Sequence, residues 1–427
     1  MLERILNDID AHEDEIVAGL KRLIETPSSD GKATMAQEIV YEEFKKLGLE
    51  TESFKGDIRP LVNYPDYCQS DIEFDENAYN VAGRLYSDNP QVDSIMLFGH
   101  IDTESEDYFG NFANPYEVRI TDDRIYGLGS SDDKGGIAMM IYALKYLLKH
   151  VKKLPYDITL MSVLGKHGGA YGTFSAIHKG YTAVNSIYLH PAETGHGFKE
   201  IKNISLGIVD LNIDIYGKNG AMHDDLDPGI NSNISAMRVI EALQRLNETN
   251  RDKYVFDFGS FKGQSSYILN IGSIISDNGY GDISLHTSIK VRVRFFMPLT
   301  VKDVMDEIEN VIADTLDEGM YRITKGNMCA SPAMVANEHQ FVKLIEDSII
   351  SISGESSFIH QYHGGSDIRL PIIYGNSNCV GIGPSCILPL KGSGEMEWIS
   401  RKDYITGVKI LATVLYKYQN YKGENNV

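Results

Sequence analysis

The run SIMLFGH, residues 94–100, is the stretch that decides the fold, because it is short, apolar and stops abruptly at a glycine and a histidine. A continuous apolar run of this length is typical of a strand that is buried on both faces of a sheet. Similar runs follow at 157–164 and 186–189, and a helical pattern over 135–150 lies before them. Strands alternating with helices predict an α/β fold, with a mixed, mostly parallel sheet covered by helices on both faces.

The flanking segments continue this alternation. Apolar residues at helical spacing predict two helices in the first 50 residues, separated by Pro27-Ser28-Ser29. Towards the C-terminus, the pattern predicts a helix near 337–352, a strand over 379–382 and a last helix near 402–418. Both ends of the chain therefore belong to the same α/β domain.

The pattern changes near residue 205, where apolar and polar residues begin to alternate. Alternation over 211–216 and again over 289–295 predicts strands of an antiparallel sheet with one polar face. Two helices fit near 232–247 and 300–316, which makes this an inserted α+β domain. The predicted boundaries are a discontinuous α/β domain over 1–204 and 318–427 and a lid over 205–317.

Composition excludes several classes of protein. The 427 residues carry 40 Lys and Arg against 60 Asp and Glu, a formal net charge of −20 that repels phosphate backbones and anionic lipid. Nucleic acid and membrane surfaces are therefore not expected as partners. The four cysteines are scattered without a CxxC pair, which favours free thiols in a reducing compartment. The acidic N-terminus resembles no signal peptide, so a cytoplasmic location is expected.

The first candidate site is the sequence GHID at 99–102. A histidine at the end of a buried strand can present a ring nitrogen to a metal, and Asp102 can reach the other ring nitrogen of His100 and select its tautomer. The pattern is short and common. The alternative interpretation of His100 is an ordinary hydrogen-bonded residue at a strand end.

The second candidate site is the sequence IYGLGSSDDKGG at 125–136. Its glycines allow tight turns, and Asp132 and Asp133 stand immediately before an apolar helix, where the helix N-terminus stabilises a carboxylate. The alternative is a simple helix cap with a solvated charge. A phosphate-binding loop is not indicated, because the order GxxxxGK[ST] is absent.

Together, these segments resemble the co-catalytic zinc aminoacylase and carboxypeptidase family, which includes acetylornithine deacetylase, succinyl-diaminopimelate desuccinylase and glutamate carboxypeptidase. The resemblance extends along nearly the whole chain. Its further motifs, in order, are Asn114-Pro115-Tyr116, Gly217-Lys218 with Ala221-Met222-His223, Pro228-Gly229-Ile230-Asn231, the GGSDIR sequence at 364–369, and Gly383-Pro384.

The resemblance implies an aminopeptidase-like catalytic domain with a ferredoxin-like lid, and amide hydrolysis at zinc, or at manganese or cobalt in its place. It implies that His100 ligates one metal, that Asp132 bridges two metals, and that Asp102 orients His100. In such enzymes a glutamate acts as the general base.

The remaining motifs imply contacts with substrate. His223 would come from the lid, often that of a neighbouring subunit, to stabilise the oxyanion, which implies a homodimer. Arg369 would clamp a substrate carboxylate, with Ser366 and Asn231 also binding substrate. The alternatives are that His223 is a surface histidine and that Arg369 simply pairs with Asp367.

The chain departs from the family after the strand at 157–164. There the family carries Asp-Glu-Glu-x-Gly, whereas this chain reads GKHGG at 165–169. Lys166 therefore stands at the position of the general base, and His167 at that of a metal ligand. We expect Lys166 to take part of a missing metal's electrostatic role or to act as a neutral base. The alternative is a structural cation paired with Asp132 or Asp133.

Two further ligand positions also differ. The family's Glu-Pro-Thr corresponds to LHPAET at 189–194, so the ligand is His190 if the proline aligns and Glu193 if Glu-Thr aligns. We favour His190. The family's last histidine ligand has no counterpart in KGSGEMEW at 391–398, unless His360 or His363 replaces it.

These substitutions predict an atypical metal site with one ion, or with one strongly and one weakly bound ion. One position would have His100, Asp132 and either His190 or Glu193, which is enough for an open zinc site. The other would have only Asp132 and His167.

The predicted function is hydrolysis of an amide bond in a small anionic substrate, such as an N-acyl amino acid or a short peptide. The two alternatives are a non-hydrolysing homologue that binds an amino-acid-like ligand and an enzyme of altered chemistry that uses Lys166 as base or nucleophile.

Overall fold

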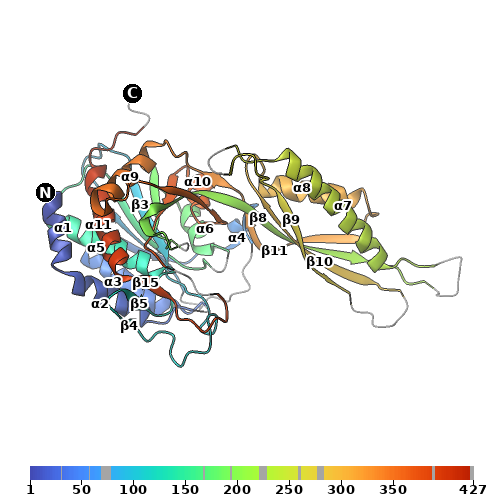
Figure 1. The fold of residues 1–427 in the computed structure, drawn as a ribbon, viewed down its shortest axis with the longest axis horizontal. Helices are drawn as coiled ribbons and strands as arrows, with labels where there is room; N and C mark the ends of the chain where they lie inside the picture. The colour runs from blue at the N-terminus through green and yellow to red at the C-terminus, as the bar shows by residue number, and fades with distance from the viewer. Residues whose placement is uncertain are drawn as a thin grey trace.

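The computed structural model describes residues 1–29, 31–56, 58–68, 78–166, 169–192, 195–220, 228–257, 261–276, 283–386 and 390–423. Figure 1 shows a larger body of helices and strands, which holds both termini, and a smaller unit of two helices on a sheet. The long strand β8 (Glu200–Tyr216) runs from one into the other.

Among the described residues, one sheet of 12 strands spans both parts, in the order β1-β2-β6-β3-β7-β14-β8-β10-β9, with β11, β12 and β13 also paired to β8. In the body its strands are β1 (Glu50–Phe54), β2 (Asn80–Leu85), β3 (Ile95–His100), β6 (Ile158–Val163), β7 (Asn185–Tyr188), β12 (Ala333–Met334), β13 (Ile359–Gly364) and β14 (Asn378–Gly381). A smaller sheet joins β4 (Arg119–Ile120), β5 (Arg124–Tyr126) and β15 (Trp398–Ser400).

The centre of the body is parallel, as predicted. Strand β3 pairs in parallel with β6 and β7, and β7 pairs in parallel with β14. The edge strands β1 and β2 are antiparallel, so the sheet is mixed. The predicted α/β class is confirmed.

Helices cover both faces of this sheet because its central strands are apolar on both sides. Ile95 and Leu97 of β3 belong to the main core, while Met96 and Phe98 point into a second core on the opposite face. The main core is covered by α1 (Leu2–Asp10), α2 (Glu13–Ile24), α3 (Thr34–Lys46), α5 (Lys134–His150), α9 (Gln340–Ser353) and α11 (Arg401–Tyr418). The other side carries α4 (Ile58–Leu61), α6 (Tyr171–His178) and α10 (Arg369–Gly375).

The N-terminal segment differs from the prediction of two helices, because the structure has three. The first predicted helix is interrupted after Asp10 and resumes at Glu13. At the break, Nδ1 of His12 lies 2.8 Å from the carbonyl oxygen of Asp8 and satisfies a group that the helix end leaves without a partner. Apolar spacing alone does not reveal this interruption, because Ile9 and Ile16 are both buried in the same core.

The smaller unit has the element order β-α-β-β-α-β. Beyond Leu206, β8 pairs with β10 (His286–Phe295) and β11 (Tyr321–Ala330), and β9 (Ile268–Ile275) pairs with β10, all antiparallel. Helices α7 (Ser232–Lys253) and α8 (Val301–Ala313) pack on one face, which is a ferredoxin-like arrangement. Strand β8 runs through residue 205 without a break, and β11 begins after residue 317. The predicted domain boundaries at these positions therefore stay a prediction.

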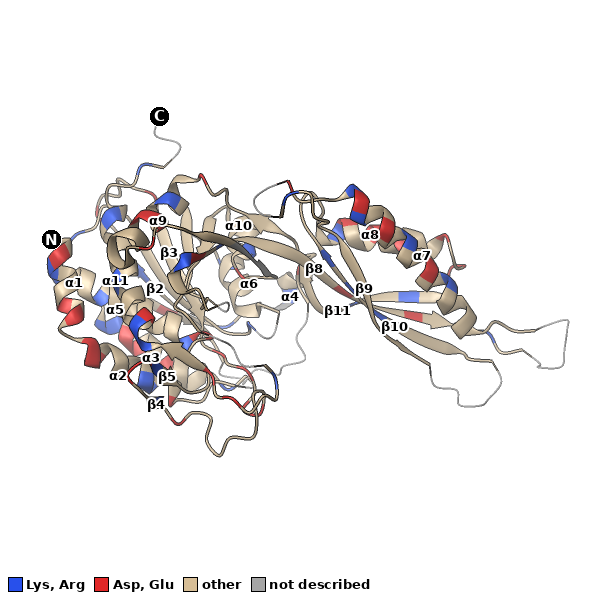
Figure 2. Ribbon diagram, viewed as in Figure 1, with Lys and Arg blue, Asp and Glu red and all other residues tan. Residues whose placement is uncertain are grey.

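The outward helices of both parts carry acidic and basic residues side by side, as Figure 2 shows for α7 and α8. Within the part of the chain that the structure describes, no helix is both long enough and apolar enough to cross a bilayer.

Candidate metal centre

Three parallel strands bring candidate residues to one edge of the sheet. His100 ends β3, Lys166 follows β6, and His190 follows β7. The carboxyl ends of neighbouring parallel strands lie side by side, and ligands bind there in open α/β sheets. Asp132 reaches the same edge from the loop that precedes α5.

His100, Asp132 and His190 converge into one compact group. Oδ1 of Asp132 lies 2.7 Å from Nε2 of His100 and 3.3 Å from Nε2 of His190. The three candidate ligand atoms lie within 4.8 Å of one another. Both histidines are buried, and only Asp132 is partly exposed, so the group opens to solvent at the carboxylate.

The pKa values of Asp132 and His100 are shifted by the charges of the side chains around them. Burial would raise the pKa of Asp132, but the nearby rings of His190 and His100 outweigh it and hold that pKa well below its usual value. Burial would likewise lower the pKa of His100, but the carboxylates of Asp132 and Asp102 raise it well above its usual value. Without a metal, Asp132 is therefore ionised against the protonated ring of His100, and a metal ion that binds here would displace that proton.

The ring of His100 is held in the orientation that a metal ligand needs. Its Nδ1 lies 2.9 Å from the main-chain oxygen of Asp102 and 3.6 Å from that residue's Oδ1. A donor at Nδ1 leaves the lone pair of Nε2 for a metal. Asp102 therefore lies beside the ring of His100, as the sequence predicted. The atom closer to Nδ1 is the main-chain oxygen of Asp102, whereas the prediction concerned its carboxylate.

The donor set fits a divalent cation. Two imidazole nitrogens and one carboxylate oxygen make a three-ligand site with an open position, as in catalytic zinc centres. No second group of three metal-ligating side chains occurs among the described residues. His167 and Glu193, two of the predicted ligands, lie outside the described residues, so their role stays a prediction.

Glu397 is a residue of this site that the sequence interpretation missed. It is buried, and its Oε1 accepts hydrogen bonds from the backbone N–H groups of Ser131 and Asp132, each at 2.8 Å. Its Oε2 accepts from the N–H of Gly129 at 2.7 Å. The carboxylate thereby fixes the loop that presents Asp132. The only sequence signal was an acid immediately before an apolar turn at Trp398.

Asp133 supports the centre from the other side. Its Oδ2 accepts a hydrogen bond from the backbone N–H of His100 at 3.2 Å, which ties the start of α5 to the end of β3. Burial raises the pKa of this carboxyl well above its usual value. Asp132 and Asp133 therefore have different environments although they are adjacent.

Lys166 makes an ion pair that the sequence did not predict. Its Nζ lies 3.0 Å from Oδ1 of Asp367, and not beside Asp132 or Asp133, the partners considered from sequence. Thr173 donates to the other oxygen of Asp367 at 2.9 Å. Burial would raise the pKa of Asp367, but Lys166 and then Arg369 lower it.

The Lys166 pair adjoins the metal centre through Tyr188. The Lys166 Nζ lies 5.9 Å from the centroid of the Tyr188 ring, and that ring lies 5.2 Å from the ring of His190. Tyr188 is fully buried, and burial raises its pKa well above the usual value. One aromatic ring therefore stands between the ion pair and the histidine.

Ser366 lies in the turn before α10, and Arg369 is the first residue of that helix. Arg369 is buried and donates from one terminal nitrogen to the main-chain oxygens of Gly365 and Ser366, at 2.8 and 3.0 Å. The same nitrogen is 3.8 Å from Asp367. Lys166, Asp367 and Arg369 line one small cavity of about 40 Å³, so the predicted substrate clamp adjoins the predicted catalytic lysine.

The other predicted residues are dispersed or undescribed. Asn231 caps α7 in the lid, where its side chain accepts from the N–H of Asn233. His223 lies outside the described residues, as does the side chain of His363. His360 contacts Glu346 at 3.1 Å and Asn203 at 3.3 Å, and no described contact joins it to the metal centre.

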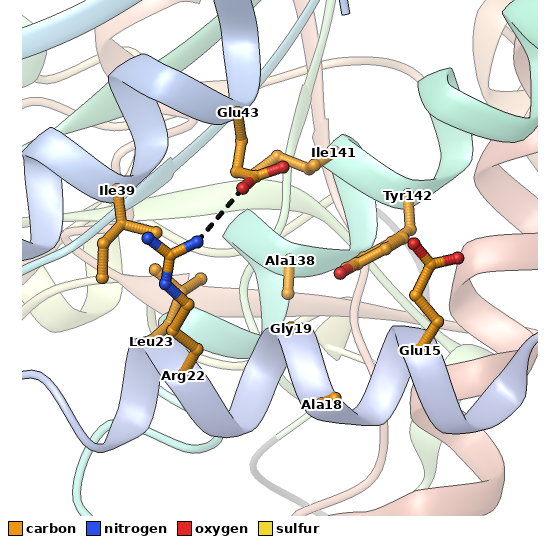
Figure 3. Close-up of a pocket in the computed structure, with 10 residues that line it drawn as sticks. All are labelled: Glu15, Ala18, Gly19, Arg22, Leu23, Ile39, Glu43, Ala138, Ile141 and Tyr142. Carbon is orange, nitrogen blue, oxygen red and sulfur yellow. Dashed lines mark hydrogen bonds and ion pairs between the residues drawn. The ribbon is translucent and has the colours of Figure 1, made fainter. Parts of the chain in front are cut away.

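A separate pocket of about 230 Å³ lies among α2, α3 and α5 (Figure 3). Its walls are largely apolar, and at its rim Arg22 pairs with Glu43 at 3.3 Å. It contains no histidine or cysteine. The candidate metal ligands His100, Asp132 and His190 are not among the residues that line it.

Comparisons with known proteins concern the family and the fold. The model of "Peptidase family M20/M25/M40" matches residues 96–417. N-formyl-4-amino-5-aminomethyl-2-methylpyrimidine deformylase of Halalkalibacterium halodurans is 30% identical over 200 residues, which are 46% of this chain and 42% of that protein. The alignment thus spans less than half of that relative's length.

Two further matches cover more of the chain. Succinyl-diaminopimelate desuccinylase of Colwellia psychrerythraea is 23% identical over 307 residues, which are 68% of this chain and 73% of that protein. The crystal structure of aminopeptidase PepT from Bacillus cereus superposes with a TM-score of 0.72 at 18% identity, covering 95% of this chain and 98% of that one. At 18% identity, the structural similarity to aminopeptidase PepT shows a shared fold alone.

Proposed function

We propose, since the chain belongs to peptidase family M20/M25/M40, that it hydrolyses the amide bond of a small anionic substrate, such as an N-acyl amino acid or a short peptide. The observation that carries this proposal is the convergence of His100, Asp132 and His190 at the carboxyl ends of the parallel strands. Relatives named as a deformylase and a desuccinylase support a substrate with an acyl group on nitrogen.

The proposed cofactor is one zinc ion, with manganese or cobalt as alternatives, held by these three side chains. When bound, such an ion polarises a carbonyl group and lowers the pKa of a coordinated water. The chain's own part is to hold the ligands: Asp102 orients His100, and Glu397 holds the loop of Asp132. A second, weaker ion would require His167.

We assign Lys166 an electrostatic role in place of the family's general base. Its Nζ lies 3.0 Å from the buried carboxylate of Asp367, and this ion pair holds the side chain in place. The ammonium would add positive charge near the centre, where the carbonyl oxygen of the amide would become negative in the transition state.

Substrate recognition is proposed for Arg369, which lines a small cavity together with Lys166, and for Ser366, whose main-chain oxygen accepts a hydrogen bond from Arg369. A guanidinium suits a substrate carboxylate. Asn231 and His223 would complete the site from the lid, His223 as an oxyanion donor.

A homodimer through the lid is part of the proposal. The edge strand β9 exposes Ile268, Ile274 and Ile275, and α7 on the same sheet exposes Ile234 and Met237. An edge strand with apolar side chains is a site at which a second chain can pair. Such a dimer would also bring a partner's lid residues towards the centre.

The test is metal content per subunit, measured by elemental analysis after purification without chelator, together with a screen of N-acetyl, N-succinyl and N-formyl amino acids and dipeptides. We expect one ion in wild type, its loss in Asp132→Ala, and no loss in Asp123→Ala, whose side chain is 74% exposed. Wild type without metal after zinc and manganese have been supplied would overturn the proposal.

The screen also separates the two alternatives. Saturable binding without turnover of any amide would indicate a ligand-binding homologue. A lysine adduct trapped by borohydride on wild type, and absent from Lys166→Met, would indicate altered chemistry at Lys166.

A further inference from the structure

Lys202 on β8 is buried beside the ring of His190. Its Nζ is 3.0 Å from Nδ1 of His190, and it also donates to the main-chain oxygen of Pro191. Lys202 is 3% exposed, and Oε1 of Glu200 lies 3.9 Å from its ammonium. A lysine is seldom buried this completely, so its position next to a candidate ligand needs a reason.

The fold makes room for Lys202 at this point. Strand β8 crosses here from the body to the lid (Figure 1), and Lys202 pairs with Gly381 of β14. A Cβ atom on Gly381 would stand 3.1 Å from Cβ of Lys202, closer than ordinary contact. The glycine therefore allows the lysine stem to lie against β14 and direct its ammonium towards His190.

The contact bears on which nitrogen of His190 carries the proton. A neutral imidazole has one N–H and one lone pair. If the ammonium donates to Nδ1, the proton is on Nε2, which then donates to Asp132 at 3.3 Å and has no lone pair for a metal. His100 is in the opposite situation, because its Nδ1 faces a carbonyl oxygen.

For His190 to bind a metal through Nε2, the proton must be on Nδ1. An acceptor for it is present, since the Pro191 oxygen lies 3.3 Å from Nδ1. Lys202 donates to the same oxygen, so the two donors would compete for it and the ring N–H would face an ammonium at 3.0 Å. The positive charge also repels an incoming cation.

We propose that Lys202 is a positioning residue that selects the Nε2–H tautomer of His190 and thereby weakens metal binding at this centre. His190 then becomes a ligand only when the hydrogen bond from Lys202 to its ring is given up. This inference rests on the proposed metal site.

The first test is Co²⁺ affinity, measured by calorimetry and by the visible absorption of the bound ion. We expect Lys202→Met to lower the Kd for Co²⁺ about tenfold or more, whereas Lys199→Met, in the 3-10 turn Gly197–Lys199 immediately before β8, leaves it unchanged. An affinity of Lys202→Met equal to or weaker than that of wild type would overturn the inference.

The second test does not depend on the variant folding. Long-range ¹H–¹⁵N spectra of metal-free wild type report the tautomer of each histidine, assigned by His190→Gln. The Nε2–H form at His190 and the Nδ1–H form at His100 are expected, and an Nδ1–H signal for His190 contradicts the inference.

Failure of the proposed function gives a different pattern. If wild type binds no Co²⁺, the metal site itself is wrong, and the tautomer spectra still test the role of Lys202. If binding is lost in His100→Ala but is unaffected by Lys202→Met, the metal site stands and the inference about Lys202 fails.

Discussion

At the scale of single residues, the site is organised by charge pairs that lie behind the candidate ligands. Lys166 contacts Asp367, Lys202 contacts His190, and Glu397 accepts three backbone N–H groups of the Asp132 loop. Lys166, Lys202 and Glu397 are not themselves candidate metal ligands. Together they determine which atoms of the three ligands are available.

The pair of Lys166 and Asp367 leads to a prediction of stability. Asp367→Asn leaves the ammonium of Lys166 without its buried carboxylate, and we expect it to lower the free energy of unfolding by about 3 to 5 kcal/mol at pH 7. The measurement is urea denaturation. Asp14→Asn, at a fully exposed side chain, is the control and should change stability by less than about 0.5 kcal/mol.

The same variant has an expected pH dependence. The pKa of Asp367 is lowered in the folded state, so its ionised form stabilises the protein above the unfolded pKa of about 3.9 and stops doing so as the pH falls through the folded value. The difference between wild type and Asp367→Asn should therefore shrink below about pH 4. A difference that stays constant down to pH 2 would contradict the ion pair.

At the scale of elements, the close approach of α5 to the strand ends positions the two aspartates. Gly136 is in the first turn of α5, where a Cβ atom would stand 2.1 Å from the main-chain oxygen of Leu189 and 2.4 Å from Asp133. Any larger residue must move the helix away from β7. The glycine is therefore required by packing, in a helix where glycine is otherwise unfavourable.

This packing reverses the usual effect of an alanine. In an open helix, Gly→Ala stabilises by about 0.5 to 1 kcal/mol. We expect Gly136→Ala to destabilise by about 1 to 3 kcal/mol instead, measured by urea denaturation. Gly272→Ala in β9 is the control, since its nearest neighbour would be at 3.7 Å. Stabilisation by Gly136→Ala would show that α5 does not approach β7 so closely.

At the scale of the whole molecule, one strand connects the candidate metal centre to the smaller unit, which is the predicted lid. The first half of β8 carries Lys202 and pairs with β13, and its second half forms the middle of the lid sheet. The outer edge of that sheet, at β9, is paired on one side only within the described residues.

That edge supports a prediction about assembly. We expect wild type to be a dimer in light scattering coupled to size-exclusion chromatography, and Ile274→Lys to be a monomer, because a charge on an apolar edge opposes pairing. Ile274 is 55% exposed, so folding should be unaffected. Ile350→Lys, at a 40% exposed position on α9, should remain a dimer. A monomeric wild type would exclude the lid dimer.

Local sequence signals predicted much of this structure. Apolar runs located β3, β6 and β7, and period-two alternation located β8 and β10. The same signals did not show the break between α1 and α2, because both helices present apolar residues to one core. Periodicity reports which face of a segment is buried, and not where a backbone stops being helical.

The site was predictable only where a motif contained it. His100, Asp132 and His190 were candidates because each adjoins a strand end or a helix start, and the structure places them together. Asp367 was considered only as a partner of Arg369, and Glu397 had no predicted role. Asp367 is 201 residues from its partner Lys166 in the sequence, and Glu397 is 265 residues from its partner Asp132.

The sequence by itself determined the α/β class, the strand ends that carry the chemistry and the family, since these follow from local periodicity and ordered motifs. Only the tertiary structure decided that Lys166 pairs with Asp367 and that Lys202 faces His190. The physical reason is that such contacts depend on strand order and on the passage of β8 through both parts of one sheet, which place distant side chains together without leaving a local pattern.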